Sequence, residues 1–451
     1  MKHVKFEREL KNLIYYVLQY GIHRSTIKAD MPNPSYDEMV AFVTNVHKGF
    51  MLAQESVVRN LTEVLQQKKK ANQQLKIDNR ERNTVAKKAD QDLLNKLKYQ
   101  ECVFRKVIDS IAFILLRYEL SDARRLYCGE EPIDITDSNL RSCIKYSQEI
   151  YQKDPMTFAL ISDLSSFIQA GDILQYRYGE KVSLIELKEG VVNEKVLETI
   201  RFCEKSRCDM FLKLTLEQEG PRFERQLFRT VKQIQKDQSI VDVINTGRGT
   251  DMFTGLNVNV MQGNVEFETF TETVKKLLKD ARAKGYAISV IDGCLPIGVY
   301  YNAKFPKEMF AHWMKVSKID APIIDLRQSI FDPTAYPIFL LGIPQNSLMD
   351  IVLGRVSVLM SLDVNQWLSP LQKDGYKIEL MSEKKMKSIY KTKQNRIHPI
   401  RTEGKCVVIE KEKAQMLLQG GLLGRMFTMF NTPSSMRKYI VEMFNQDQFK
   451  S

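Results

Sequence analysis

The feature that most constrains the fold is a long stretch in which almost nothing interrupts a helix. Residues 40–120 contain no proline and a single glycine, Gly49. Proline and glycine break or weaken helices, so their near absence over this length favours long α-helices. Hydrophobic residues at helical spacing give way to a largely polar run at 66–92. We therefore expect two long helices that form a hairpin and turn near residues 78–80.

The segments on either side of this hairpin are also predicted to be helical. Residues 4–19 carry hydrophobic side chains at helical spacing. Ser35 and Glu38 have the spacing of a capping box, which marks the start of a helix. Residues 102–120 are hydrophobic enough to form a buried helix that joins the hairpin to the rest of the chain. We therefore predict that residues 1–135 form a helical interaction arm.

From residue 136 the pattern changes to short β-prone runs between helices. A helix capped by Asp137 or Ser138 is expected to end at Asp154, because the residue before a proline disfavours the helical conformation. This order of elements is typical of a mixed α/β domain, which we place at residues 136–300. Beyond the first helix we expect strands at 158–161, 173–178, 182–187, 210–216 and 287–291, and helices at 191–206 and 221–244.

Residues 301–451 are interrupted by prolines and are predicted to form an α+β C-terminal region with a role in recognition or regulation. No internal repeat or low-complexity tract divides this region further. Helices are expected at 347–362 and 437–445, and strands at 377–380 and 406–409.

The charge and the cysteine content narrow the class of protein. The formal net charge is +12 and the isoelectric point is about 9.1, which favours a polyanionic partner such as nucleic acid. The seven cysteines include no CxxC pair, so a zinc site is not expected. We find no signal peptide and no run of about 18 hydrophobic residues. We therefore expect a cytoplasmic protein with reduced thiols and no membrane partner.

One hairpin-like stretch gathers side chains that carry chemistry. Two β-prone runs flank a turn at Gly179 and Glu180, so residues whose numbers sum to 358–360 should face one another. Asp172 then falls opposite the segment from Glu186 to Lys188. Glu186 and Lys188 are two residues apart and project from the same face of their strand. We therefore predict that Asp172, Glu186 and Lys188 converge.

This group of side chains suits the hydrolysis of phosphodiester bonds. Mg²⁺ (or Mn²⁺) takes hard oxygen ligands, often one or two carboxylates together with substrate phosphate and water. Such an ion polarises the phosphate and acidifies the attacking water. A nearby lysine can orient that water and offset the developing negative charge. Asp172, Glu186 and Lys188 are therefore the candidate catalytic residues, and the two carboxylates are candidate metal ligands.

Asp172, the hairpin and the sequence IELK at 185–188 together resemble the PD-(D/E)xK superfamily, which includes restriction endonucleases and many repair and phage-defence nucleases. The resemblance implies a restriction-endonuclease-like core of a helix, a three-strand meander, a helix and a further strand, which matches the order of the expected elements. It also implies that Asp172 and Glu186 bind the metal and that Lys188 assists the water. Many members add a glutamate from the preceding helix, and Glu149 is the candidate third metal ligand.

Two departures from the superfamily pattern are visible. Gly171 stands where the family name has proline. Some branches carry a glutamine on the helix after the third strand, whereas residues 191–206 contain no glutamine. Gln226, Arg229 and Gln233 share one face of the later helix, but they follow too late in the chain for that motif. They are therefore left out of the predicted site.

The leading hypothesis is a Mg²⁺-dependent endonuclease that hydrolyses phosphodiester bonds of DNA, and the resemblance implies a role in anti-phage defence. The helical arm would then serve homodimerisation or bind a partner protein. An alternative is a nucleic-acid-binding or scaffolding protein with a degenerate nuclease core. A third hypothesis is a helical interaction protein whose positive charge serves only solubility.

Overall fold

The computed structural model describes residues 2–25, 27, 33–136, 139–187, 190–250, 257–259, 265–389, 398–412 and 414–445. The chain divides into two compact units. One unit comprises residues 15–260, and the other comprises residues 1–14 together with 261–451. The domain boundaries expected at 135 and 300 do not coincide with this division. The chain is a mixed α/β protein in which helices predominate and the strands form small antiparallel sheets.

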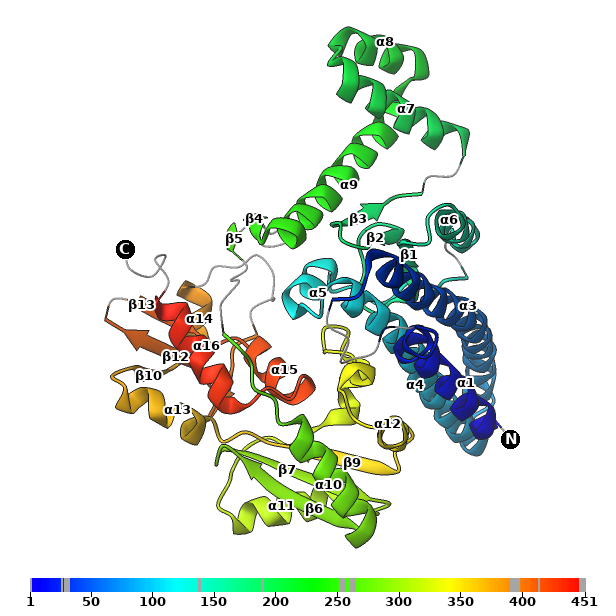
Figure 1. Cartoon of the computed structure of the whole chain (residues 1–451). Coiled ribbons are helices and arrows are strands. Elements are labelled where there is room, and N and C mark those ends of the chain that lie inside the picture. The colour runs from blue at the N-terminus through cyan, green and yellow to red at the C-terminus, as the bar shows by residue number, and fades with distance from the viewer. Residues whose placement is uncertain are drawn as a thin grey trace. The chain divides into compact units, whose positions relative to one another are not determined.

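The predicted helical hairpin is confirmed in residues 15–260 (Figure 1). Helix α3 runs from Tyr36 to Arg80 and α4 runs from Thr84 to Leu115. The capping box is also confirmed, because the Glu38 N–H donates to Ser35 Oγ and the Ser35 N–H donates to the Glu38 carboxylate at 2.8 Å. The short helices α2 (Tyr20–His23) and α5 (Leu120–Leu126) also lie in this unit, whereas most of α1 (Lys2–Leu18) belongs to the other one.

A helix and a three-stranded antiparallel sheet follow, in the order β1-β2-β3. Ile173 pairs with Ile185 and Leu174 with Leu184, so paired numbers sum to 358 and the predicted hairpin register is confirmed. The expected caps at 137 and 138 lie outside the described residues. These elements are α6 (Leu140–Lys153), β1 (Thr157–Ile161), a 3-10 turn η1 (Ser162–Leu164), β2 (Ile173–Arg177) and β3 (Val182–Ile185).

The strand expected at 210–216 is wrong, because this segment is helical. Leu212, Leu214 and Leu216 alternate with other residues as a strand would, but leucine, lysine and methionine are also strong helix formers. Leu212 and Leu216 are one helical turn apart and pack on a hydrophobic cluster that spans two neighbouring helices. The elements here are α7 (Val191–Ser206), α8 (Asp209–Glu219), α9 (Pro221–Thr246), β4 (Arg248–Thr250) and β5 (Asn257–Asn259).

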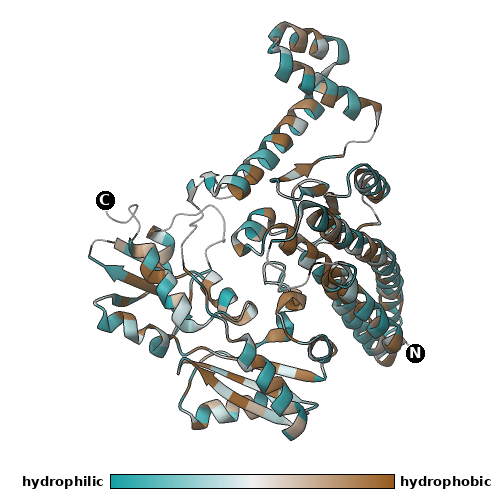
Figure 2. Cartoon of the chain, viewed as in Figure 1, coloured by the Kyte–Doolittle hydropathy of each residue, from teal (hydrophilic) through white to brown (hydrophobic). Residues whose placement is uncertain are grey.

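The other unit contains two four-stranded sheets, one in the order β6-β7-β9-β8 and one built around β12. Hydrophobic residues colour much of β7 and β9 in Figure 2, as buried strands require. The elements of the first sheet and its helices are α10 (Thr271–Lys284), β6 (Tyr286–Ile291), β7 (Leu295–Tyr301), α11 (Pro306–Val316), β8 (Ile324–Asp325), η2 (Leu326–Phe331), η3 (Ile338–Leu340), α12 (Gln345–Val352) and β9 (Val356–Met360). Those of the second are α13 (Val364–Lys373), β10 (Lys377–Met381), α14 (Glu383–Ile389), β11 (Arg401–Thr402), β12 (Lys405–Lys411), β13 (Ala414–Leu417), α15 (Gly421–Thr428) and α16 (Pro433–Asn445).

The single helix expected over 347–362 is wrong in its second half. Helix α12 ends at Val352, and Gly354 then adopts a φ of +75°, a left-handed conformation that terminates helices. Valine residues follow and form β9, as β-branched residues favour. Among the described residues, no helix combines the length and the hydrophobicity that a membrane crossing requires.

Helix α3 packs against α6 and the first strand of the three-stranded sheet. The buried Gln54 donates from Nε2 to the Ser147 hydroxyl at 3.0 Å and to the Ala159 carbonyl at 3.3 Å. Its Oε1 accepts the Ile161 N–H at 2.9 Å. One buried side chain thus connects α3, α6 and β1. Buried polar groups with all their partners in place specify how elements pack, so the hairpin forms part of the support for the sheet.

Asp122 in α5 provides a test of this packing by pH. Burial, with Glu119 nearby, raises the pKa of the Asp122 carboxyl to about 7. A folded-state pKa above the unfolded value means that this group's stabilisation is present below about pH 4 and is lost as the pH rises through 7. We therefore expect Asp122→Asn to stabilise the fold more at pH 8 than at pH 5. The difference in the free energy of unfolding between the two pH values should be about 1–2 kcal/mol.

Thermal unfolding followed by circular dichroism at both pH values measures this effect. Asp92→Asn, on the exposed side of α4, is the matched control for the removal of one aspartate, and this surface change should melt close to the wild type. An equal response of the two variants would contradict the assignment of the pH effect to Asp122.

Candidate active site

Asp172 directly precedes β2 and is hydrogen-bonded to residues at and just beyond the end of the neighbouring strand β3. Its N–H donates to the Ile185 carbonyl at 2.9 Å, and its Oδ2 accepts the Leu187 N–H at 2.6 Å. Its own carbonyl accepts the Ser162 N–H at 3.0 Å. The carboxylate is therefore fixed beside the backbone of residue 186, at the end of the sheet where β1 ends, β2 begins and β3 ends.

Gly171 explains the first departure from the superfamily pattern. It adopts a φ of +65°, which proline cannot reach because its ring holds φ near −65°. A Cβ at this position would also lie 3.1 Å from the Leu184 side chain. The turn into β2 therefore requires glycine in this chain.

Glu186 is held by a residue that the sequence interpretation left out. Gln233 of α9 donates from Nε2 to Glu186 Oε1 at 2.5 Å. Gln226 on the same helix face donates to Asn193 Oδ1 at 2.8 Å, and Asn245 donates to the Val182 carbonyl at 3.0 Å. Helix α9 therefore runs alongside β3 and the segment that follows it, so a residue distant in sequence reaches the site. The shared face of Gln226 and Gln233 was the signal available in the sequence.

The structure does not bring Glu149 into this cluster. Glu149 is exposed and lies 3.8 Å from Lys145 on the surface of α6. The end of α6 that approaches the site is the other one, where Asn139 donates to the Leu187 carbonyl at 3.2 Å. Ten residues separate Glu149 from Asn139, which is about 15 Å along a helix. Lys188, the third predicted catalytic residue, lies outside the described residues.

The remaining oxygen donors bear on whether a metal fits. In the described part of the chain, no three His, Cys, Asp or Glu side chains are gathered closely enough to hold an ion. Magnesium commonly takes only one or two carboxylates and completes its shell with phosphate and water, so Asp172 and Glu186 meet the minimum donor set. Ser162, whose N–H donates to the Asp172 carbonyl, has a buried hydroxyl that lacks a hydrogen-bond partner among the described residues.

The connection between β1 and β2 is fixed by buried charges on α4. Arg105 donates from Nη1 to the Asp163 carbonyl at 2.6 Å and from Nη2 to the Ile133 carbonyl at 2.8 Å. Asp109 accepts the Ser165 hydroxyl at 2.7 Å and the Ser166 N–H at 2.8 Å. These contacts restrain the segment that leads into Asp172. A rigid support of this kind is what a catalytic carboxylate needs.

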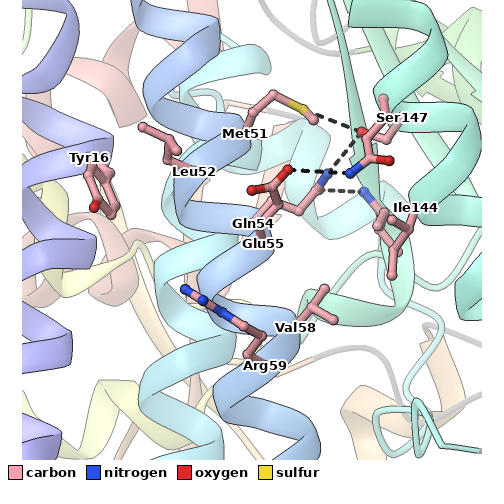
Figure 3. Close-up of a pocket in the computed structure, with 11 residues that line it drawn as sticks. Tyr16, Met51, Leu52, Gln54, Glu55, Val58, Arg59, Ile144 and Ser147 are labelled. Carbon is pink, nitrogen blue, oxygen red and sulfur yellow. Dashed lines mark hydrogen bonds between the residues drawn. The ribbon is translucent and has the colours of Figure 1, made fainter.

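A cavity of about 390 Å³ lies between α3 and α6 (Figure 3). Its lining includes the hydrophobic side chains of Met51 and Val58 and the charged side chains of Glu55 and Arg59. Gln148 donates to Glu55 at 3.4 Å. The cavity has the size of a small-molecule site, but neither Asp172 nor Glu186 lines it, so phosphodiester chemistry is assigned to the end of the sheet instead.

Comparisons with protein-family models, with curated proteins and with solved structures found no match to this chain.

Proposed function

We propose that this chain is a metal-dependent phosphodiesterase that cleaves nucleic acid, with DNA as the first substrate to test. The observation that carries the proposal is the position of two carboxylates at one end of the β2–β3 hairpin. Asp172 is fixed beside residue 186 by the Leu187 N–H, and Glu186 is fixed by Gln233. A role in anti-phage defence rests on the sequence resemblance alone, and a cytoplasmic location rests on the number and irregular spacing of the cysteines.

Each described side chain has a defined part in the proposed chemistry. A Mg²⁺ ion held by Asp172 and Glu186 would neutralise charge on the phosphate and acidify a water molecule. Gln233 orients the Glu186 carboxylate through its 2.5 Å hydrogen bond. The Leu187 N–H orients the Asp172 carboxylate in the same way. Lys188 is proposed, from its position in the sequence, to orient the attacking water.

A second candidate function is nucleic-acid binding by a degenerate nuclease core. Helix α8 stands where the superfamily order calls for a further strand, and this departure favours the alternative. The two candidates differ in whether the site takes up metal.

The deciding experiment combines plasmid cleavage with metal-dependent stability. We expect supercoiled plasmid to be nicked or linearised in Mg²⁺ or Mn²⁺ and to remain intact in EDTA. We also expect either metal, at about 100 times its dissociation constant, to stabilise the fold by about 2.7 kcal/mol. Thermal shift of the same protein sample measures the second effect. Stabilisation without cleavage would indicate an intact site that requires another substrate or an activating partner. Neither effect, on DNA or RNA, would contradict the proposal and favour the degenerate core.

A further inference from the structure

Helix α9 carries a row of positive charges on one face. Arg222, Arg225, Arg229 and Lys232 follow one another at intervals of three, four and three residues, the spacing of a single helix face. All four side chains are exposed, and none forms an ion pair within the described ranges. We name these four residues the α9 basic stripe. Figure 2 shows hydrophilic residues recurring along α9 between hydrophobic ones.

The charge of the stripe is not cancelled by its own helix. Glu224 and Asp242 are the exposed or partly exposed acids of α9, and both fall about 120° around the helix from the middle of the stripe. The nearest acid before the helix, Glu219, is paired with Lys195 at 2.5 Å. The stripe therefore presents a one-signed charge to solvent.

The stripe is rigid and leads to the candidate active site. The other side of α9 is buried, where Phe223 and Leu227 pack on Val196 and Ile200 of α7. The stripe spans about 15 Å, at 1.5 Å per residue. Its third member, Arg229, is one helical turn from Gln233, the residue that holds Glu186. A polyanion lying along the stripe would thus be directed toward the two carboxylates.

The chemistry of the stripe fits a nucleic-acid backbone better than a membrane. Its cations lie about 5 Å apart on a straight helix, and a DNA duplex offers one negative charge per roughly 1.7 Å of its axis. A helix that lies on a membrane inserts its hydrophobic face into the lipid. Most of the hydrophobic face of α9 is packed in the cluster with α7 and α8, and Phe228, half exposed, is the large hydrophobic side chain of this helix that remains in solvent. One such side chain is a small hydrophobic surface for insertion into lipid, whereas the four cations form a continuous row.

We propose that the α9 basic stripe binds the phosphate backbone of nucleic acid without reading base sequence. Arginine and lysine contacts to phosphate position a protein on the duplex but carry no sequence information. The further step, in which the stripe delivers the backbone to Asp172 and Glu186, rests on the proposed function. The binding itself does not depend on catalysis.

The test measures binding of the full chain to a short fluorescent DNA duplex in EDTA over a range of salt concentrations. The stripe variant replaces Arg222, Arg225, Arg229 and Lys232 with glutamine. We expect its log–log salt dependence to be shallower than that of the wild type by about 3.6, since each of the four phosphate contacts contributes roughly 0.9. Affinity at low salt should fall at least tenfold, and a duplex of scrambled sequence should behave identically.

Two further variants separate the stripe from total charge and from folding. The matched control replaces four exposed lysines, and it lowers the net charge from +12 to +8 (12 − 4 = 8) as the stripe variant does. It should keep the wild-type salt dependence. Replacing the three stripe arginines with lysine should also keep it, because phosphate attraction depends on charge. The lysines of the control are Lys276, Lys279, Lys284 and Lys307.

The outcomes distinguish this proposal from the proposed function. Binding that depends on the stripe in a chain that never cuts would support the stripe and contradict the nuclease. An unchanged salt dependence in the stripe variant, or an equal loss in the lysine control, would overturn the stripe. So would stripe-dependent binding to vesicles rich in anionic lipid with no binding to DNA.

Discussion

Glu186→Gln is expected to reduce metal-dependent cleavage by at least about 10³-fold while leaving the fold intact. Loss of one carboxylate from the ion removes several kcal/mol of charge stabilisation, and each 1.36 kcal/mol is a factor of ten in rate. Glutamine keeps the length of the side chain and an oxygen that accepts the hydrogen bond from Gln233. The substitution therefore removes charge and little else.

Asp172→Asn provides the second half of this test. The asparagine oxygen still accepts the Leu187 N–H, so the end of the hairpin should remain closed. We expect a loss of cleavage comparable to that of Glu186→Gln and a loss of the stabilisation by Mg²⁺ or Mn²⁺. Initial rates of plasmid nicking and thermal shifts with and without metal measure the two effects.

The matched control is Glu180→Gln on the turn of the same hairpin. Glu180 is exposed and bonds only with its near neighbour Arg177 at 2.6 Å in the structure described. Exposed pairs of this kind contribute little to stability, so this variant should cut as the wild type does. Wild-type cleavage by Glu186→Gln and Asp172→Asn would contradict the assignment of the site. A loss of cleavage in Glu180→Gln would show that removing any carboxylate from the hairpin has this effect, so the loss in the other two variants would not identify the site.

The register of the hairpin could be predicted from the sequence because strand geometry has a strict period of two. A turn marked by Gly179 then determines which residues face one another, and a slip by one residue would expose the buried side of the strands. The helical hairpin was predictable for a similar reason, since a long segment without proline has few alternatives. The same register places Asp172 opposite Glu186, so the pairing of these two residues could be predicted from local spacing alone.

The rest of the site depends on packing between distant segments, which spacing does not report. Gln233 reaches Glu186 only because α9 packs along β3. The position of a residue in a helix does not indicate which distant segment the residue will contact. The segment 210–216 fits both a strand and a helix by pattern, and its contacts with α7 and α9 decided the outcome. Glu149 sits on the expected helix, but that helix approaches the site with its other end.

The charges buried in α4 illustrate the same limit. Arg105, Lys106 and Asp109 stand within a hydrophobic segment, and their spacing is equally compatible with a solvated helix face. In the structure all three side chains are almost completely buried, and Lys106 Nζ lies 3.2 Å from Asp109 Oδ2. Asp109 also accepts hydrogen bonds from Ser165 and Ser166. It thereby joins α4 to the segment that leads to Asp172.

Asp109→Ala is therefore expected to destabilise the fold by about 3–5 kcal/mol, because it leaves a buried ammonium group without its neighbouring carboxylate. For a unit of this size the thermal midpoint should fall on the order of 10 °C. Chemical denaturation and circular dichroism measure both quantities. Replacing the pair together, as Lys106→Met with Asp109→Leu, should cost less than the sum of the single changes, since an apolar pair has no charge left to compensate.

The control for Asp109→Ala is Glu149→Ala, which removes one partner of an exposed ion pair on α6. Exposed pairs contribute between about 0 and 1 kcal/mol, so this variant should melt close to the wild type. It should also retain full cleavage, because Glu149 stands away from Asp172 and Glu186. A loss of less than about 1 kcal/mol in Asp109→Ala would mean that the segment entering β2 does not depend on α4. The rigidity attributed to Asp172 would then require another source, whereas a large loss would identify the helical hairpin as the support on which the site is built.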